Sequence, residues 1–86
     1  MTGHILIVED EIAIADTIVY ALKTEGFTPH HCELGEEALS QIRHGNFKLA
    51  ILDIGLSDLS GFEVCRRLRK FSDLPVIFLT WATPPP

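Results

Sequence analysis

Three short runs of the chain are apolar without alternation, which predicts strands that are covered on both faces. These runs are residues 5–8, 49–52 and 76–79. Unbroken apolar strands are typical of parallel sheets that carry helices on both sides. A weaker fourth strand is predicted over residues 27–32, after the turn at Gly26.

Helical spacing of apolar residues fills the segments between these strands. The i, i+3, i+4, i+7 pattern of a first helix is made by Ala15, Ile18, Val19 and Leu22. A second helix is predicted over residues 36–44. Ser60 and Glu63 have the spacing of a capping box, which predicts the start of a third helix. The buried side of that helix is expected to consist of Val64, Cys65, Leu68 and Phe71.

Strands and helices alternate in the order βαβαβαβ, which predicts an α/β fold with a parallel sheet and right-handed crossovers. The common strand order 2-1-3-4 makes the first and third strands neighbours. Pro75 excludes further helix before the last strand. The chain ends in a run of prolines, so we expect one domain over residues 1–80 and an extended tail over residues 81–86.

Composition and charge narrow the choice of partner. The 86 residues suffice for one small domain, and a hydrophobic content of 47% is that of a globular chain. A formal net charge of −5 argues against binding nucleic acid through this segment. The dense basic group is interpreted as the solvated face of a helix, and it consists of Arg66, Arg67, Arg69 and Lys70.

The sequence shows neither a secretory leader nor an apolar stretch close to the roughly 20 residues of a membrane span. We therefore expect a cytoplasmic protein that does not contact a membrane. Cys32 and Cys65 are expected to be reduced, packed thiols. Neither takes part in the Cys or His spacing that is typical of a structural metal site.

Polar residues follow directly on the apolar strands. Glu9, Asp10 and Glu11 come after the first strand, Asp53 comes at the end of the third, and Thr80 follows the fourth. Ligands of open parallel sheets bind beyond the carboxyl ends of the strands. These side chains are therefore predicted to share one cleft.

Carboxylates that converge on one cleft repel one another unless a cation or a proton compensates. Hard oxygen ligands suit Mg²⁺, so we expect this ion beside Asp10 and Asp53. Glu11 is better explained as a polar start of the first helix. A carboxylate beside Mg²⁺ can act as a nucleophile and form an aspartyl phosphate. Thr80 has two interpretations, as a hydrogen-bond donor to a phosphoryl oxygen or as an ordinary residue at a strand end.

At this point three segments resemble the receiver domain of bacterial response regulators. They are ILIVEDE at residues 5–11, LAILDIGLSDLSGFEVCRRLR at residues 49–69 and PVIFLT at residues 75–80. The segments IADTIVYAL and GFEVCRRL are most similar to the OmpR/PhoB group and its CreB-like members. The resemblance implies a flavodoxin-like, doubly wound parallel sheet, here truncated to βαβαβαβ.

The resemblance also implies signal transduction through a two-component phosphorelay. By position, Asp53 would accept a phosphoryl group from a partner sensor histidine kinase. Asp10 would bind Mg²⁺ directly, Glu9 would bind it through water, and the backbone carbonyl of Gly55 would be a further ligand. Thr80 would be the switch hydroxyl. The output, regulation of transcription, would belong to a domain outside this chain, and the receiver itself would be no enzyme beyond its own phosphorylation.

The chain also departs from the family. A complete receiver continues into a fourth helix, a fifth strand and a fifth helix, and its essential Lys stands at the end of that fifth strand. Trp81 occupies a position where the family has a small residue, and residues 81–86 look foreign to it. The fourth strand would then form an exposed apolar edge. We therefore expect a homo-oligomer that pairs through this edge.

Two other classes of function stay open. A truncated receiver could lack the chemistry and act only as an oligomerising or protein-binding scaffold. A stand-alone α/β enzyme is less consistent with the sequence, which has no GxGxxG motif and no P-loop. A haloacid-dehalogenase-type phosphatase also uses an Asp at a strand end, but it needs a second Asp where this chain has Gly55.

Overall fold

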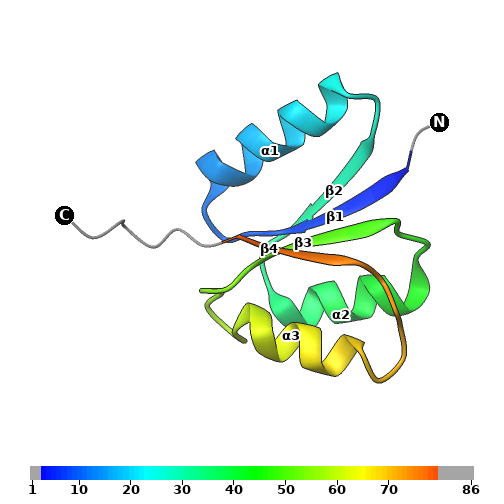
Figure 1. Ribbon diagram of the computed structural model, residues 1–86. Coiled ribbons are helices and arrows are strands. Elements are labelled where there is room, and N and C mark those ends of the chain that lie inside the picture. Colours follow the sequence, from blue (N-terminus) through cyan, green and yellow to red (C-terminus); the bar gives the residue numbers. More distant parts are fainter. Residues whose placement is uncertain (1–2, 80–86) are drawn as a thin grey trace.

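The computed structural model describes residues 3–79, in which strands and helices alternate as the sequence predicts (Figure 1). The elements are β1 (His4–Val8), α1 (Ile12–Thr24), β2 (Thr28–Cys32), α2 (Gly35–His44), β3 (Leu49–Asp53), α3 (Gly61–Leu68) and β4 (Val76–Leu79). Thr80 and the predicted tail over residues 81–86 lie outside the described residues, so the domain boundary at residue 80 stays a prediction.

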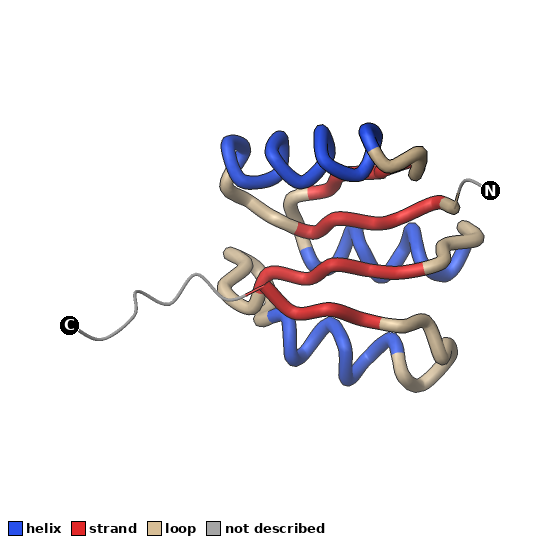
Figure 2. Tube along the Cα trace, turned by 45° about the horizontal axis from the view of Figure 1, so that its top comes forward, coloured by secondary structure: helices blue, strands red, loops and turns tan. Residues whose placement is uncertain are grey.

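The strands form one parallel sheet in the order β2-β1-β3-β4, which confirms the predicted order 2-1-3-4 (Figure 2). In this order β1 and β3 are neighbours, with Val8 paired to Leu52 at their carboxyl ends. The residues that follow these two strands therefore emerge side by side at one edge of the sheet.

Helices cover both faces of the sheet, with α1 on one side and the pair α2 and α3 on the other (Figure 1). Side chains of β1 alternate between the two sides, as the pleat of a strand requires. Leu6 and Val8 join the larger core cluster with α2 and α3, whereas Ile5 and Ile7 form a smaller one beneath α1. Coverage on both sides explains why the strands are apolar without alternation.

The helix α1 is less deeply packed than its apolar spacing suggests. Ala15 is buried, but Ile18, Val19 and Leu22 are only partly buried against the smaller cluster. On its side of the sheet α1 has no second helix beside it within residues 3–79 (Figure 1). The flanks of this helix therefore stay open to solvent.

The start of α3 confirms half of the predicted capping box. The Ser60 Oγ accepts a hydrogen bond from the Glu63 backbone N–H at 3.1 Å. The Glu63 carboxylate, however, pairs with Arg66 and Arg67. Two neighbouring guanidinium groups thus engage the carboxylate on the exposed side of the helix.

The predicted buried side of α3 needs a correction. Val64 and Leu68 are buried, as expected, but Cys65 and Phe71 are only partly buried. The reason is that a helix on a sheet buries a narrow stripe, and Cys65 lies beside that stripe. Phe71 follows the end of α3, where its ring lies 4.1 Å from the guanidinium carbon of Arg43.

No helix within residues 3–79 combines the length and the apolar character that crossing a membrane requires. Both cysteines are free, and Cys32 is buried at the end of β2. Burial raises the pKa of the Cys32 thiol to about 12, and the Glu37 and Asp58 carboxylates act in the same direction. Cys32 is therefore a neutral packing residue and no nucleophile.

Candidate functional site at the carboxyl edge of the sheet

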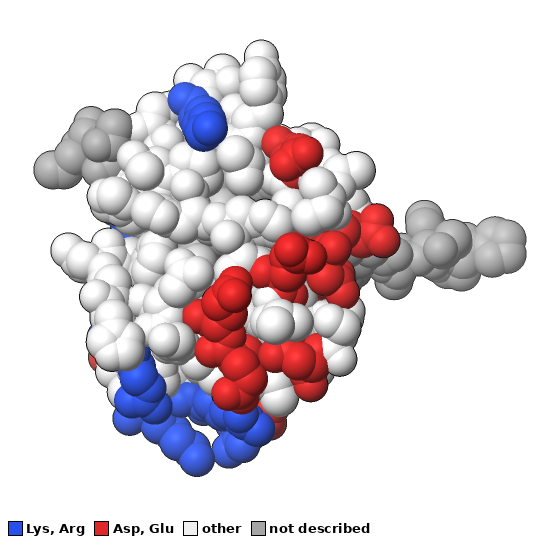
Figure 3. Space-filling view, turned by 180° about the vertical axis from the view of Figure 1, so that it is seen from behind, with Lys and Arg blue, Asp and Glu red and all other residues white. Residues whose placement is uncertain are grey.

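Three carboxylates meet where β1 and β3 end. Glu9 and Asp10 follow β1, Asp53 is the last residue of β3, and one oxygen of each lies within 4.8 Å of the others. The predicted convergence of the acids at these strand ends is confirmed for these three residues, whereas Glu11 lies exposed outside the cluster. Asp and Glu side chains gather in a band on the face seen in Figure 3, and Lys and Arg side chains lie at one end of that band.

Glu9 is 0% exposed, and hydrogen bonds engage its backbone N–H, its carboxylate and its backbone carbonyl. Its backbone N–H donates to the Cys32 carbonyl at 3.1 Å, and its side-chain Oε1 accepts from the Glu11 N–H at 3.0 Å. The Nε2–H of His31 donates to the Glu9 carbonyl at 2.7 Å. The sequence assigns no role to His31, because a histidine in a strand carries no sign of a partner 22 residues away.

Asp53 is 7% exposed, and its Oδ1 accepts a hydrogen bond from the Gly55 N–H at 3.1 Å. The strand continues its pairing one residue further, because the Ile54 N–H donates to the Leu79 carbonyl at 3.3 Å. The Asp53 carboxylate is thus held by its own loop, and the backbone that follows it is held by β4.

Gly61, the first residue of α3, packs directly against the backbone of Asp53. A Cβ atom at this position would lie 2.4 Å from the Asp53 carbonyl oxygen. The Gly61 N–H also donates to the Ile54 carbonyl at 2.9 Å, which closes the loop that begins at Asp53. The start of α3 can approach the site so closely because residue 61 has no side chain.

The charges of the cluster repel one another. At 4.8 Å two carboxylates repel by about 1 kcal/mol in water and by about 3 kcal/mol at an effective dielectric constant of 20. Within residues 3–79, Asp10 and Asp53 form no ion pair with Lys or Arg. A compact set of hard oxygen ligands fits Mg²⁺, whose ligand distances are about 2.1 Å.

Three further residues were assigned a place at or near the site from the sequence: Gly55, Thr80 and Glu11. Gly55 is exposed two residues beyond Asp53. Thr80 lies outside the described residues, directly after Leu79, which pairs with Asp53 in the sheet. Glu11 occupies the N-cap position of α1, in keeping with the polar helix start that the sequence predicts.

Comparison with known proteins decides the family. The model of the response regulator receiver domain matches residues 5–85. The chain belongs to this family. As a receiver domain it is 49% identical over 75 residues to the transcriptional regulatory protein CreB of Escherichia coli, which confirms the predicted likeness to CreB. That alignment covers 86% of this chain and 33% of CreB, so the chain spans about a third of that relative.

Solved structures confirm the receiver fold. The response regulator TrrA of Thermotoga maritima, determined in complex with Mg²⁺-BeF, superposes with a TM-score of 0.88 at 39% identity. TrrA in complex with the histidine kinase ThkA superposes with a TM-score of 0.87. Each alignment covers 94% of this receiver and 71% of the TrrA chain.

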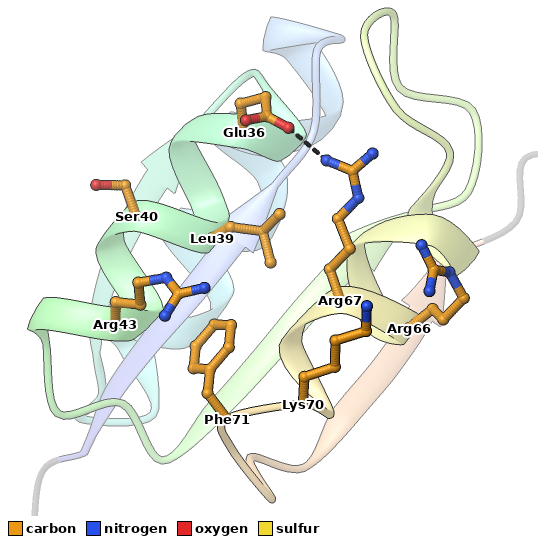
Figure 4. A pocket seen from close by; sticks show the side chains of 8 residues that line it. All are labelled: Glu36, Leu39, Ser40, Arg43, Arg66, Arg67, Lys70 and Phe71. Carbon is orange, nitrogen blue, oxygen red and sulfur yellow. Dashed lines mark hydrogen bonds and ion pairs between the residues drawn. The ribbon is translucent and has the colours of Figure 1, made fainter.

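A hollow between α2 and α3 is lined mainly by basic side chains (Figure 4) and shares no residue with the acidic cluster. Its volume is about 630 Å³, and Arg43, Arg66, Arg67 and Lys70 line it together with Glu36. The Arg67 guanidinium bridges Glu36 of α2 at 2.7 Å and Glu63 of α3 at 2.7 Å. Arg66, Arg69 and Lys70 are exposed, as a solvated helix face requires, whereas Arg67 is half-buried and joins the two helices.

Proposed function

We propose that this receiver domain accepts a phosphoryl group on the Asp53 carboxylate within a two-component phosphorelay. The observation that supports the proposal is the convergence of Glu9, Asp10 and Asp53 within 4.8 Å beyond β1 and β3. In this proposal Mg²⁺ binds Asp10, Asp53 and the Gly55 carbonyl directly, and Glu9 through water. The ion would offset the charge of the carboxylates and of the incoming phosphoryl group.

The chemistry asked of the protein is a single substitution at phosphorus. A carboxylate oxygen of Asp53 forms the new P–O bond while the bond from phosphorus to the donor nitrogen or oxygen breaks, and the donor leaves with its electron pair. The Gly55 N–H engages Oδ1, so the second oxygen, Oδ2, is free of that hydrogen bond and is the proposed nucleophile. In the same proposal the Thr80 hydroxyl binds a phosphoryl oxygen afterwards and serves as the switch.

The proposed donor is a sensor histidine kinase, which fits the family and the solved complex of TrrA with ThkA. The proposed output is regulation of transcription, since CreB is named a transcriptional regulatory protein. The domain that would carry this output lies outside the chain. A cytoplasmic location and the lack of any catalysis beyond self-phosphorylation belong to the same proposal.

The test is the intact mass of the purified chain after incubation with Mg²⁺ and acetyl phosphate. We expect an adduct of one phosphoryl group, which disappears when Mg²⁺ is chelated. Asp53→Asn is the matched control, because it keeps the shape of the side chain and removes its nucleophilic charge. If the folded chain gains no adduct, the phosphorelay proposal fails for these 86 residues, and the scaffold alternative takes its place.

A further inference from the structure

The helix α2 begins without a cap of its own. Its N-cap residue is Leu34, whose side chain has no atom that could accept a hydrogen bond. The N–H groups of Gly35 and Glu36 donate instead to the two carboxylate oxygens of Asp58, at 2.8 and 3.0 Å. Asp58 therefore does the work of an N-cap from a position more than 20 residues further along the chain.

The charge of Asp58 suits this position. Partial desolvation raises the pKa of its carboxyl, but hydrogen bonds from the backbone N–H groups of Glu36, Gly35, Leu59 and Asp58 itself together outweigh this and hold the pKa below its usual value. The group is thus ionised at neutral pH, beside the positive end of a helix dipole.

The contact between Asp58 and α2 is part of a closely packed junction. A Cβ atom on Gly35 would lie 2.6 Å from Val64 Cγ2 of α3 and 3.2 Å from the Cβ of Leu59. The Glu36 side chain also contacts α3, where it pairs with Arg67 (Figure 4). The first turn of α2, the loop between β3 and α3, and α3 itself therefore meet with no room for an intervening side chain.

The same loop carries the candidate site. It leaves β3 at Asp53, passes through Gly55 and returns to α3, where the Gly61 N–H donates to the Ile54 carbonyl. Leu56 is buried in the core and anchors the first part of the loop. Asp58 anchors the remaining part, between Leu56 and the start of α3.

We propose that Asp58 is a positioning residue for the phosphorylation site, because its carboxylate fastens the loop over residues 54–60 to the first turn of α2. The Gly55 carbonyl is thereby fixed relative to Asp53, with no contact between Asp58 and the ion or the phosphoryl group. This inference rests on the proposed function. It adds α2 to the elements that shape the site.

The test compares Asp58→Ala and Asp58→Asn with Ser60→Ala in the 86-residue chain. Ser60 lies in the same loop, but its side chain caps α3, where it accepts a hydrogen bond from the Glu63 N–H. Each Ala variant removes one helix cap, so we expect similar losses in Tm. Mg²⁺ affinity, measured by calorimetry, is expected to fall about tenfold in Asp58→Ala, the size typical of lost outer-sphere support. It should fall less in Asp58→Asn, which keeps one acceptor oxygen, and stay unchanged in Ser60→Ala.

Amide hydrogen exchange supplies a readout that needs neither metal nor phosphate. The N–H groups of Gly55 and Gly61 should exchange faster in Asp58→Ala than in Ser60→Ala, since only the first variant frees the loop from α2. If Asp58→Ala matches Ser60→Ala in both Mg²⁺ affinity and exchange, Asp58 is a helix cap alone and the inference is wrong. If the unmodified chain binds no Mg²⁺ and gains no phosphoryl group, the proposed function fails, and the exchange rates alone decide whether Asp58 holds the loop.

Discussion

The Asp53 carboxylate combines near-complete burial with two negative neighbours. Asp53 is the last residue of a strand whose other side chains are apolar, and it stays buried at the carboxyl edge of the sheet. Glu9 is buried beside it, and Asp10 is half-buried. Burying like charges together destabilises a fold unless a ligand or another group compensates. Clusters of buried acids are therefore found more often at functional sites than elsewhere.

Metal binding should therefore change stability at the scale of single residues. We expect Mg²⁺ to raise the Tm of the chain, by the equivalent of about 2.7 kcal/mol at a concentration 100 times its Kd. Asp10→Asn removes one charge from the cluster, so the metal-free variant should be at least as stable as the unmodified chain. The rise in Tm on adding Mg²⁺ should be smaller for Asp10→Asn than for the unmodified chain. Thermal unfolding with and without Mg²⁺ measures both effects.

Glu11→Gln is the matched control for this prediction, because Glu11 is the next acid along the chain and is exposed outside the cluster. Its response to Mg²⁺ should equal that of the unmodified chain. An equal loss of response in both variants would mean that Mg²⁺ acts through the general acidity of this face and has no specific site.

At the scale of elements, α2 and α3 are joined by charges as well as by apolar packing. Glu63 accepts hydrogen bonds from Arg66 and Arg67 of its own helix, and Arg67 extends to Glu36 of α2. Hydrogen bonds from Arg66 and then Arg67 lower the pKa of the Glu63 carboxyl to about 2. The network is exposed, so salt screens it and its contribution is modest.

This network predicts that the stability of the folded chain depends on pH. The pKa of Glu63 is lower in the folded chain than its ordinary value of 4.5, so its stabilising effect is fully present above that value. The effect is lost as the pH falls through about 2. Glu63→Gln should therefore lower the Tm at pH 6, and the difference from the unmodified chain should shrink as the pH approaches 2. Thermal unfolding followed by circular dichroism across this range measures it.

Glu33→Gln serves as the control, since Glu33 is exposed and takes part in none of the ion pairs among residues 3–79. It should leave the Tm nearly unchanged at pH 6. A difference for Glu63→Gln that stays constant from pH 6 to pH 2 would show that the network does not act through the charge of Glu63.

At the scale of the whole molecule, the two faces of the sheet are unequally covered, and β4 forms one of its two edges within the described residues. Two helices pack on one face and one on the other, and within the described residues β4 pairs with β3 alone (Figure 2). Ile77 in β4 is 51% exposed, and Tyr20 on α1 is 75% exposed. The oligomer expected from the sequence stays a prediction that either surface could satisfy.

For a polypeptide of these 86 residues we expect association through the β4 edge, because an apolar strand with unpaired backbone groups is a template for a second strand. Sedimentation velocity over a wide range of concentration should show a dimer or larger species. Ile77→Lys should shift the population toward monomer, whereas Tyr20→Lys should not. If Tyr20→Lys shifts the population toward monomer and Ile77→Lys does not, the surfaces that associate lie on α1. A compact monomer at all concentrations would contradict the prediction.

The sequence by itself determined the order of elements and the chemistry at the strand ends. Apolar runs and helical spacing are local patterns, so they located β1, β3 and β4 together with the helices between them. The acids at the ends of β1 and β3 were visible because they interrupt runs of residues that are otherwise apolar. Parallel crossovers then placed Glu9, Asp10 and Asp53 at one edge without any knowledge of distances.

Only the tertiary structure decided which distant residues hold that site in shape. His31 at the Glu9 carbonyl, Asp58 at the first turn of α2 and Gly61 against the Asp53 carbonyl have no local signal. Each contact depends on how closely separate elements pack, and this is set by the shapes of many side chains together. Partial burial of Cys65 has the same origin, because helical spacing fixes the direction of a side chain but not what covers it, and Phe71 lies beyond the end of α3, where that spacing no longer applies.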